Sequence, residues 1–209
     1  TKMYPVIATC FGQMNVPVYA TIGNHDYQYG CATDAESRAH YEDVFGPVCY
    51  SLDRGDVHII IFDDVLRTGS GAGDDYKFGW EDDQQKWILK DLSMVPVSKR
   101  VIVAVHIPFG TRAFEHKVEF MTKLATFKSA LILSGHGHDI SNNLDNRNYA
   151  KVIEENEVGS TGAPWKGDFL ADGCPRGYKV YEFNGTEITA DYYKSIGYDK
   201  THQMRMYRT

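Results

Sequence analysis

Three apolar runs in this sequence each end in a loop that carries side chains able to bind a metal ion. The runs are residues 17–22, 101–105 and 130–133. The loops that follow them are Gly23-Asn24-His25-Asp26, His106-Ile107-Pro108 and Gly135-His136-Gly137-His138. Sheets of α/β proteins build their binding sites at the carboxyl ends of the strands. If the runs are strands of one sheet with a common direction, four histidines and an asparagine meet at one edge.

Segments with helical spacing of apolar side chains lie between these runs. Such spacing extends over residues 80–92 and again over residues 114–126, which predicts two amphipathic helices. Residues 35–45 favour a short helix, and residues 57–62 form a further apolar run typical of a strand covered on both faces. Residues 3–14 fit the end of a helix or a loop. The alternation of strand and helix predicts an α/β fold.

The C-terminal third has a different pattern. Residues 178–183 and 187–192 flank Asn184-Gly185, which predicts a β-hairpin whose tight turn uses the positive φ that Asn and Gly adopt easily. No linker divides the chain. We therefore expect one domain over residues 1–209, with a hairpin region at about 174–193 and a tail over 194–209 that could lead to a further domain.

The charge and length of the chain limit the classes of partner. A chain of 209 residues corresponds to about one domain, and its net charge of −6 disfavours a broad nucleic-acid interface, which needs a basic face. A small phosphorylated substrate remains compatible, because bound cations reverse the local charge of a site. No run of about 20 apolar residues is present, so we expect no membrane span.

Cysteine usage and the first residues leave alternatives open. The four cysteines are scattered without a C-x-x-C pair, which disfavours a zinc knuckle. They are either free thiols or, in an exported protein, include a Cys31–Cys49 bridge. The chain begins at Thr1 without a signal-peptide pattern, and a mature product, an excised domain and a fragment all fit this start.

The residues of the first loop have complementary chemistry. Gly23 permits a sharp turn, Asn24 offers a carbonyl oxygen to a cation, and His25 can donate a proton. Asp26 could hold the His25 ring in one tautomer. Each loop alone also fits a solvated or core-edge histidine, but the occurrence of all three favours a metal site.

Taken together, the loops resemble the calcineurin-like metallophosphoesterases, whose motifs G-N-H-[DE], a later lone histidine and G-H-x-H occur here in the same order. The resemblance extends over about residues 16–193. It implies a fold of two stacked mixed β-sheets flanked by helices. The stretch from residue 172 onward is similar to a subgroup common among exported bacterial enzymes, which implies a periplasmic or exported location.

The resemblance also implies a role for each site residue. Asn24, His106 and His136 would bind the second metal of a dinuclear centre, and His138 would bind the first. His25 would stay off the metals and protonate the leaving group, with Asp26 orienting it. The centre would hold two divalent ions, Mn, Fe or Zn, and would hydrolyse a phosphomonoester or a phosphodiester. Two further residues are expected to border the substrate: Arg112 and Trp165.

The chain departs from the family pattern at its start. The family motifs D-x-H and G-D-x-x-D, which supply the first metal's ligands and the bridging aspartate, do not occur upstream of Gly23. Asp63 and Asp64 stand in the wrong places to replace them. We therefore expect a family member that lacks its first strands and has impaired activity. The alternatives are a non-catalytic binding module and a fragment completed by another chain, such as the missing N-terminal segment of the same protein.

Overall fold

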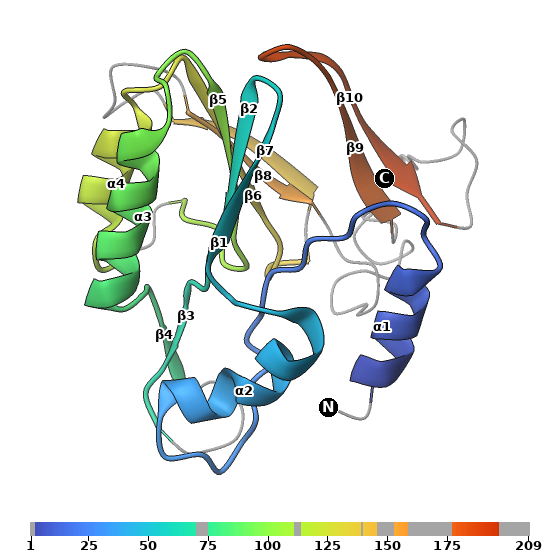
Figure 1. Cartoon of the computed structure of the whole chain (residues 1–209), viewed down its shortest axis with the longest axis vertical. Coiled ribbons are helices and arrows are strands. Elements are labelled where there is room, and N and C mark those ends of the chain that lie inside the picture. The colour runs from blue at the N-terminus through green and yellow to red at the C-terminus, as the bar shows by residue number, and fades with distance from the viewer. Residues whose placement is uncertain are drawn as a thin grey trace, which may run out of the picture.

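A computed structural model shows an α/β fold built around one large mixed β-sheet (Figure 1). The residues that it describes are 3–69, 75–110, 114–138, 140–145, 153–158 and 177–196. The helices are α1 (Tyr4–Gly12), α2 (Asp34–Phe45), α3 (Asp82–Met94) and α4 (Lys117–Leu124). The strands are β1 (Tyr50–Arg54), β2 (Val57–Ile61), β3 (Val65–Arg67), β4 (Tyr76–Phe78), β5 (Arg100–Ala104), β6 (Ser129–Ser134), β7 (Ile140–Asp145), β8 (Ile153–Val158), β9 (Gly177–Asn184) and β10 (Glu187–Ser195).

The large sheet has the strand order β1-β2-β5-β6-β8-β7. Strands β2, β5, β6 and β8 run parallel, whereas β1 and β7 pair antiparallel at the two edges. Ala104 at the end of β5 pairs with Leu133 near the end of β6. The prediction that the runs at 101–105 and 130–133 are neighbouring parallel strands is therefore confirmed.

Different layers cover the two faces of the sheet. On one face, Val101 and Val103 of β5 lie in the main core, to which α3 contributes Ile88 and Leu92. On the other face, Ile102 packs in a second cluster with partly buried side chains of the β9–β10 hairpin. This alternation follows from the two-residue period of a strand. Figure 1 shows α3 and α4 on one side of the sheet and the hairpin on the other, so the expected stacking of two sheets with flanking helices is confirmed.

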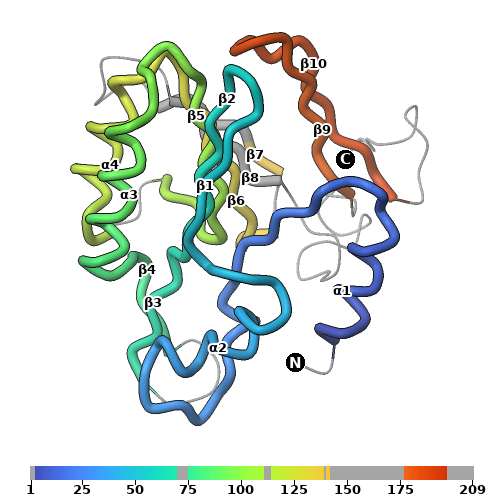
Figure 2. Tube along the Cα trace, viewed as in Figure 1, coloured from blue at the N-terminus to red at the C-terminus, as the bar shows by residue number. Residues whose placement is uncertain are grey.

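The run at residues 17–22 is not a strand, which corrects the prediction. It follows α1 as an irregular segment and belongs to no ladder within the described part of the chain. Its apolar character serves burial, because Ile22 is fully buried in the main core. A side chain anchors it, since the Tyr50 hydroxyl donates a hydrogen bond to the Ala20 carbonyl at 2.8 Å. Figure 2 traces this segment from α1 toward the middle of the molecule.

The other predicted elements exist, with local shifts. The helix expected at 35–45 is α2, and its first turn is capped by the Thr33 hydroxyl, which accepts a hydrogen bond from the Glu36 amide. In the hairpin, Asn184 pairs with Glu187, so the two-residue turn begins at Gly185, which has a φ of 58°. The turn thus lies one residue later than predicted.

The described residues also bear on the cysteines and on a possible membrane span. Cys10, Cys31 and Cys49 are free thiols, so the possible Cys31–Cys49 bridge is not formed. Within the described ranges, no helix combines the length and the apolar character that a membrane crossing requires.

Candidate functional site

The loops after β5 and β6 meet at the carboxyl edge of the large sheet. His106 lies two residues beyond β5, and His136 lies two residues beyond β6. The Gly135 amide donates a hydrogen bond to the His106 carbonyl at 3.0 Å, which joins the two loops directly. Because these strands are parallel neighbours, the sheet itself brings the two histidines together.

The first loop reaches the same place from outside the sheet. Asn24 is buried, and its Oδ1 lies 2.8 Å from Nε2 of His106. Nδ1 of His136 lies 3.2 Å from the same His106 nitrogen. Potential ligand atoms from two other loops therefore lie within 3.2 Å of the His106 nitrogen, and we call Asn24, His106 and His136 the Asn-His-His cluster.

The spacing of this cluster fits a bound divalent ion. Histidine nitrogens bind zinc at about 2.0–2.1 Å, so two that share one tetrahedral ion lie about 3.3–3.4 Å apart. The 3.2 Å between the His106 and His136 nitrogens is close to this value. The cluster contains only two histidines. In the described ranges, no group of three or more His, Cys, Asp or Glu side chains is arranged to hold a metal ion. The third donor is the Asn24 amide oxygen.

The electrostatics of His106 suit a metal ligand. Burial, together with the nearby His136, His25 and His138 rings, lowers the pKa of His106 to about 3. At neutral pH the imidazole is therefore uncharged and retains a lone pair, the form in which histidine binds metals. The same influences show that all four predicted histidines lie in one region of the molecule.

Gly23 is required by packing as well as by the turn. A Cβ at this position would lie 2.9 Å from both Cε1 and Nδ1 of His106, closer than side chains tolerate. Only glycine lets the first loop approach the imidazole face so closely. The motif glycine thus places Asn24 against His106.

The loop after β6 has an unusual backbone. His136 has a φ of 62° and His138 a φ of 60°, values that residues other than glycine seldom adopt. The turn is closed by a hydrogen bond of 2.7 Å from the Gly137 amide to the Gly135 carbonyl. Strained conformations of this kind persist where the surroundings fix them, often at functional sites.

His25 and Asp26 lie beside the cluster. His25 is exposed, as a proton donor to substrate requires. Asp26 closes its own turn, because its carboxylate accepts hydrogen bonds from the Gly23 amide at 2.9 Å and from the Tyr4 hydroxyl at 3.3 Å. Burial raises the pKa of Asp26, and the nearby His25 ring opposes that rise. Orientation of the His25 ring by Asp26 stays a prediction.

Two of the predicted site residues lie outside the described ranges. Two aspartates that the sequence analysis did not include in the site contact its loops. Arg112 and Trp165 are in stretches that the structure does not describe. Asp64 accepts hydrogen bonds from the backbone of the His106 turn, and Asp63 contacts Tyr27, just after the first loop. The sequence signal that could have indicated both aspartates is their place directly after a buried strand.

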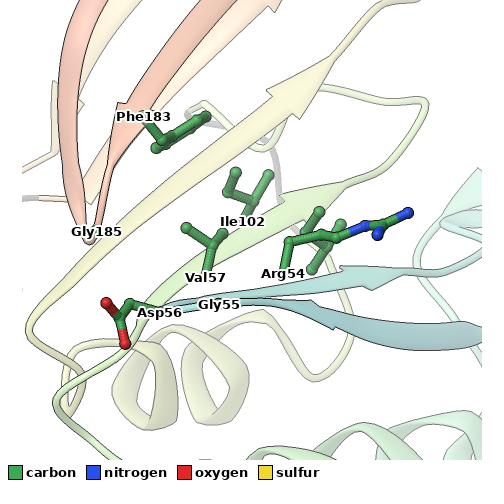
Figure 3. Close-up of a pocket in the computed structure, with 8 residues that line it drawn as sticks. Arg54, Gly55, Asp56, Val57, Ile102, Phe183 and Gly185 are labelled. Atoms are coloured by element: carbon green, nitrogen blue, oxygen red, sulfur yellow. The ribbon is translucent and has the colours of Figure 1, made fainter. Parts of the chain in front are cut away.

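A separate pocket lies at the other end of the strands. It has a volume of about 410 Å³ and opens between the start of β2 and the tip of the β9–β10 hairpin. Figure 3 shows Val57, Ile102 and Phe183 facing it, with Arg54 and Asp56 at the turn between β1 and β2. None of the predicted site residues that the structure describes lines it.

Comparison with known proteins finds a family similarity in the C-terminal part of the chain. Residues 154–209 match the family model described as the C terminal of calcineurin-like phosphoesterase. No curated protein matches the chain. Calcineurin-like phosphoesterases generally use divalent metals, in agreement with the donor atoms of the Asn-His-His cluster. Over residues 154–209 this chain is therefore similar to the C-terminal part of calcineurin-like phosphoesterases, and the order of the three loops and the stacked α/β fold agree with that similarity.

Proposed function

We propose that this chain forms a metal-dependent site for the hydrolysis of a small phosphomonoester or phosphodiester. The observation that carries the proposal is the Asn-His-His cluster, in which the Asn24 oxygen and the His136 nitrogen lie 2.8 and 3.2 Å from Nε2 of His106. The family match gives independent support.

Each residue has a distinct task in this proposal. The Asn-His-His cluster holds one divalent ion, Mn, Fe or Zn, and His138 contributes to a second. The bound ions neutralise phosphoryl oxygens and lower the pKa of water. His25, exposed beside the cluster, protonates the departing alcohol.

The role of His25 has a direct test. In a chain that hydrolyses phosphoesters, His25→Ala should lower kcat by about 10²–10⁴-fold, the usual contribution of a general acid. Bound metal, measured by elemental analysis, should stay unchanged, because His25 is not among the ligands. Unchanged turnover would show that the role is misassigned.

A second candidate function is a binding module that holds one ion without catalysis. The described residues supply only two histidines and an amide to the cluster. In this case the chain binds a divalent ion weakly and hydrolyses little. A third arrangement is completion of the site by another chain that carries further ligands, and co-purification with such a chain would support it.

Titration calorimetry with Zn²⁺ or Mn²⁺, combined with hydrolysis of bis-p-nitrophenyl phosphate, separates the first two candidates. Binding of two ions with measurable hydrolysis supports the phosphoesterase, whereas one weakly bound ion without hydrolysis supports the binding module. His106→Ala should abolish binding in either case. His116→Asn is the control for the loss of one imidazole, because His116 pairs with Asp82 outside the cluster and Asn tolerates its left-handed backbone. An exported location also stays a proposal.

A further inference from the structure

Two consecutive carboxylates, Asp63 and Asp64, follow β2 directly and are almost completely buried, with 3% and 0% of their surface exposed. Burying a carboxylate is costly unless hydrogen bonds compensate it. Apolar residues would suit this place, since Phe62 and Val65 on either side lie in the main core. The burial of two carboxylates here therefore needs a reason, and the groups that they contact supply it.

Asp64 holds the turn that carries His106. Its Oδ1 accepts a hydrogen bond from the His106 amide at 3.0 Å, and its Oδ2 accepts one from the Ile107 amide at 2.9 Å. These amides lie just past the end of β5, where the ladder no longer provides acceptors. The carboxylate thus fixes the backbone from which the His106 ring projects toward Asn24.

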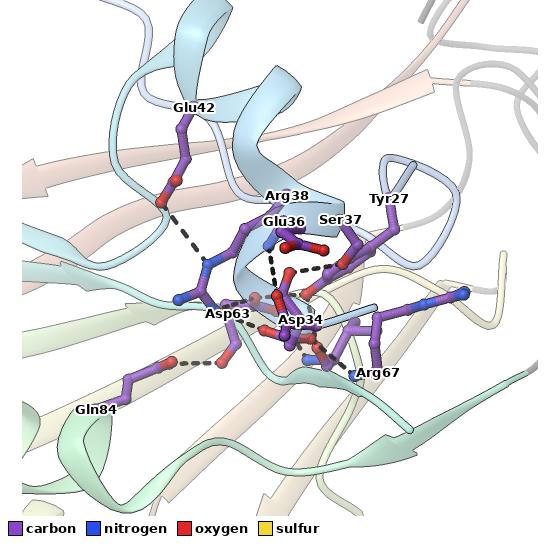
Figure 4. A network of polar contacts seen from close by, with 11 residues as sticks. Tyr27, Asp34, Glu36, Ser37, Arg38, Glu42, Asp63, Arg67 and Gln84 are labelled. Carbon is purple, nitrogen blue, oxygen red and sulfur yellow. Dashed lines mark hydrogen bonds and ion pairs between the residues drawn. The ribbon is translucent and has the colours of Figure 1, made fainter. Parts of the chain in front are cut away.

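Asp63 holds the first loop through Tyr27. The Tyr27 hydroxyl lies 2.5 Å from Oδ2 of Asp63 and 2.6 Å from the Val65 carbonyl. Tyr27 follows Asn24 by three residues and is itself buried. Figure 4 shows Asp63 within a polar network that also includes Arg38, whose Nη1 lies 3.7 Å from Oδ2 of Asp63.

The two side chains therefore reach different loops from one point of the sheet. Asp64 contacts the His106 turn, and Asp63 contacts Tyr27, three residues after Asn24. Asn24 and His106 lie 2.8 Å from each other. We infer that Asp63 and Asp64 are a positioning pair, which sets the distance between Asn24 and His106 for a divalent ion. This inference rests on the proposed function.

The test for Asp64 is Asp64→Asn in the full chain. The amide retains the shape, but its NH₂ group faces backbone N–H donors, so one of the two acceptors is lost. Groups that orient metal ligands typically contribute about 10–100-fold to metal affinity, and we expect Zn²⁺ binding by calorimetry to weaken by this factor. Asp91→Asn is the matched control: Asp91 also accepts two hydrogen bonds, from His58 and Ser51, but contacts neither loop. It should leave the Zn²⁺ affinity unchanged.

A second, smaller change keeps the test decisive if Asp64→Asn does not fold. Tyr27→Phe removes only the hydroxyl that joins the first loop to Asp63. It should also weaken Zn²⁺ binding by about tenfold or more. Zn²⁺ affinities within threefold of the wild-type value for every folded variant would overturn the inference.

A readout without metal separates this inference from the proposed function. NMR of the His106 ring, together with hydrogen exchange of the His106 and Ile107 amides, reports the position of the turn in the metal-free chain. Shifted ring signals and faster exchange in Asp64→Asn, absent in Asp91→Asn, support the positioning role even if the wild-type chain binds no Zn²⁺. Unchanged ring signals and exchange would overturn that role, whatever the outcome for metal binding.

Discussion

His106 is held from three directions, each through a different kind of contact. The Asp64 carboxylate accepts its backbone amide, the Asn24 oxygen lies against its ring nitrogen, and Gly23 packs on the ring face. Burial of the ring keeps it uncharged at neutral pH by lowering its pKa to about 3. Single-residue changes at these contacts should therefore displace the His106 ring or the loop that carries Asn24.

Gly23→Ala tests the close approach to the imidazole. The added methyl would lie 2.9 Å from two ring atoms of His106, so either the ring or the loop must move. We expect a loss of about 1–3 kcal/mol in the free energy of unfolding, measured by urea denaturation, as for other overpacked sites. Gly12→Ala is the control, because a Cβ at Gly12 meets nothing within 4 Å. Equal stability of the two variants would contradict the packing argument.

Asp63 should make stability depend on pH. Burial raises the pKa of Asp63 from 3.8 to about 7, so the folded state binds a proton that the unfolded state releases between these values. The stabilisation from this proton is complete below about pH 4 and is lost as the pH rises through about 7. Relative to wild type, Asp63→Asn should therefore become more stable as the pH rises from 4 to 7.

The measurement for Asp63 is urea unfolding at several pH values across this window. The exposed Asp43→Asn in α2 serves as the control for the loss of one carboxylate. A difference between Asp63→Asn and wild type that stays constant with pH would contradict burial of a protonated Asp63.

At the scale of elements, the β9–β10 hairpin supplies the second layer. Its partly buried side chains, including Phe183 and Ile188, pack on Val57, Ile102 and Leu131 of the large sheet. The two strands of the hairpin pair only with each other among the described elements. This contact therefore attaches the hairpin to the sheet.

Phe183→Ala tests the attachment. The ring is partly buried against the sheet, so its removal should lower the free energy of unfolding by about 1–2 kcal/mol, less than for a fully buried Phe. Hydrogen exchange should become faster in β9 and β10 than in β5. Glu182→Ala, an exposed neighbour in the same strand, should have little effect on either measurement. A similar loss in both variants would show that the hairpin is not held through Phe183.

At the scale of the whole molecule, the two ends of the parallel strands carry different features. The carboxyl ends of β5 and β6 carry the Asn-His-His cluster, and the pocket beside Val57 opens at the opposite ends of the strands. Helices cover one face and the hairpin covers the other (Figure 1). An ion at the cluster would connect three loops that are far apart in sequence.

Divalent ions should accordingly stabilise the whole fold. A ligand that binds only the folded state adds about 2.7 kcal/mol when its free concentration is about 100 times Kd. Zn²⁺ should therefore raise the Tm measured by calorimetry, EDTA should reverse the rise, and His106→Ala should abolish it. A rise of equal size in His106→Ala would place the ion elsewhere.

The sequence by itself determined the features that depend on local patterns. Apolar periodicity indicated α3, the parallel strands β5 and β6, and the β9–β10 hairpin, and each histidine after a strand end was readable from its position. These predictions hold because helical and strand periodicity, and the place of a loop after a strand, are properties of neighbouring residues.

Only the tertiary structure decided the features that depend on distant partners. An apolar run becomes a strand only beside another strand, and residues 17–22 have none among the described elements, so they fold as a buried irregular segment. The contact between Asn24 and His106 joins residues 82 positions apart, and no local pattern reports it. Asp64 was set aside because its position matched no motif, although the folded chain places it on the backbone of the His106 turn. Hydrogen bonds between loops are fixed by the packing of the sheet, and packing is not a local property of the sequence.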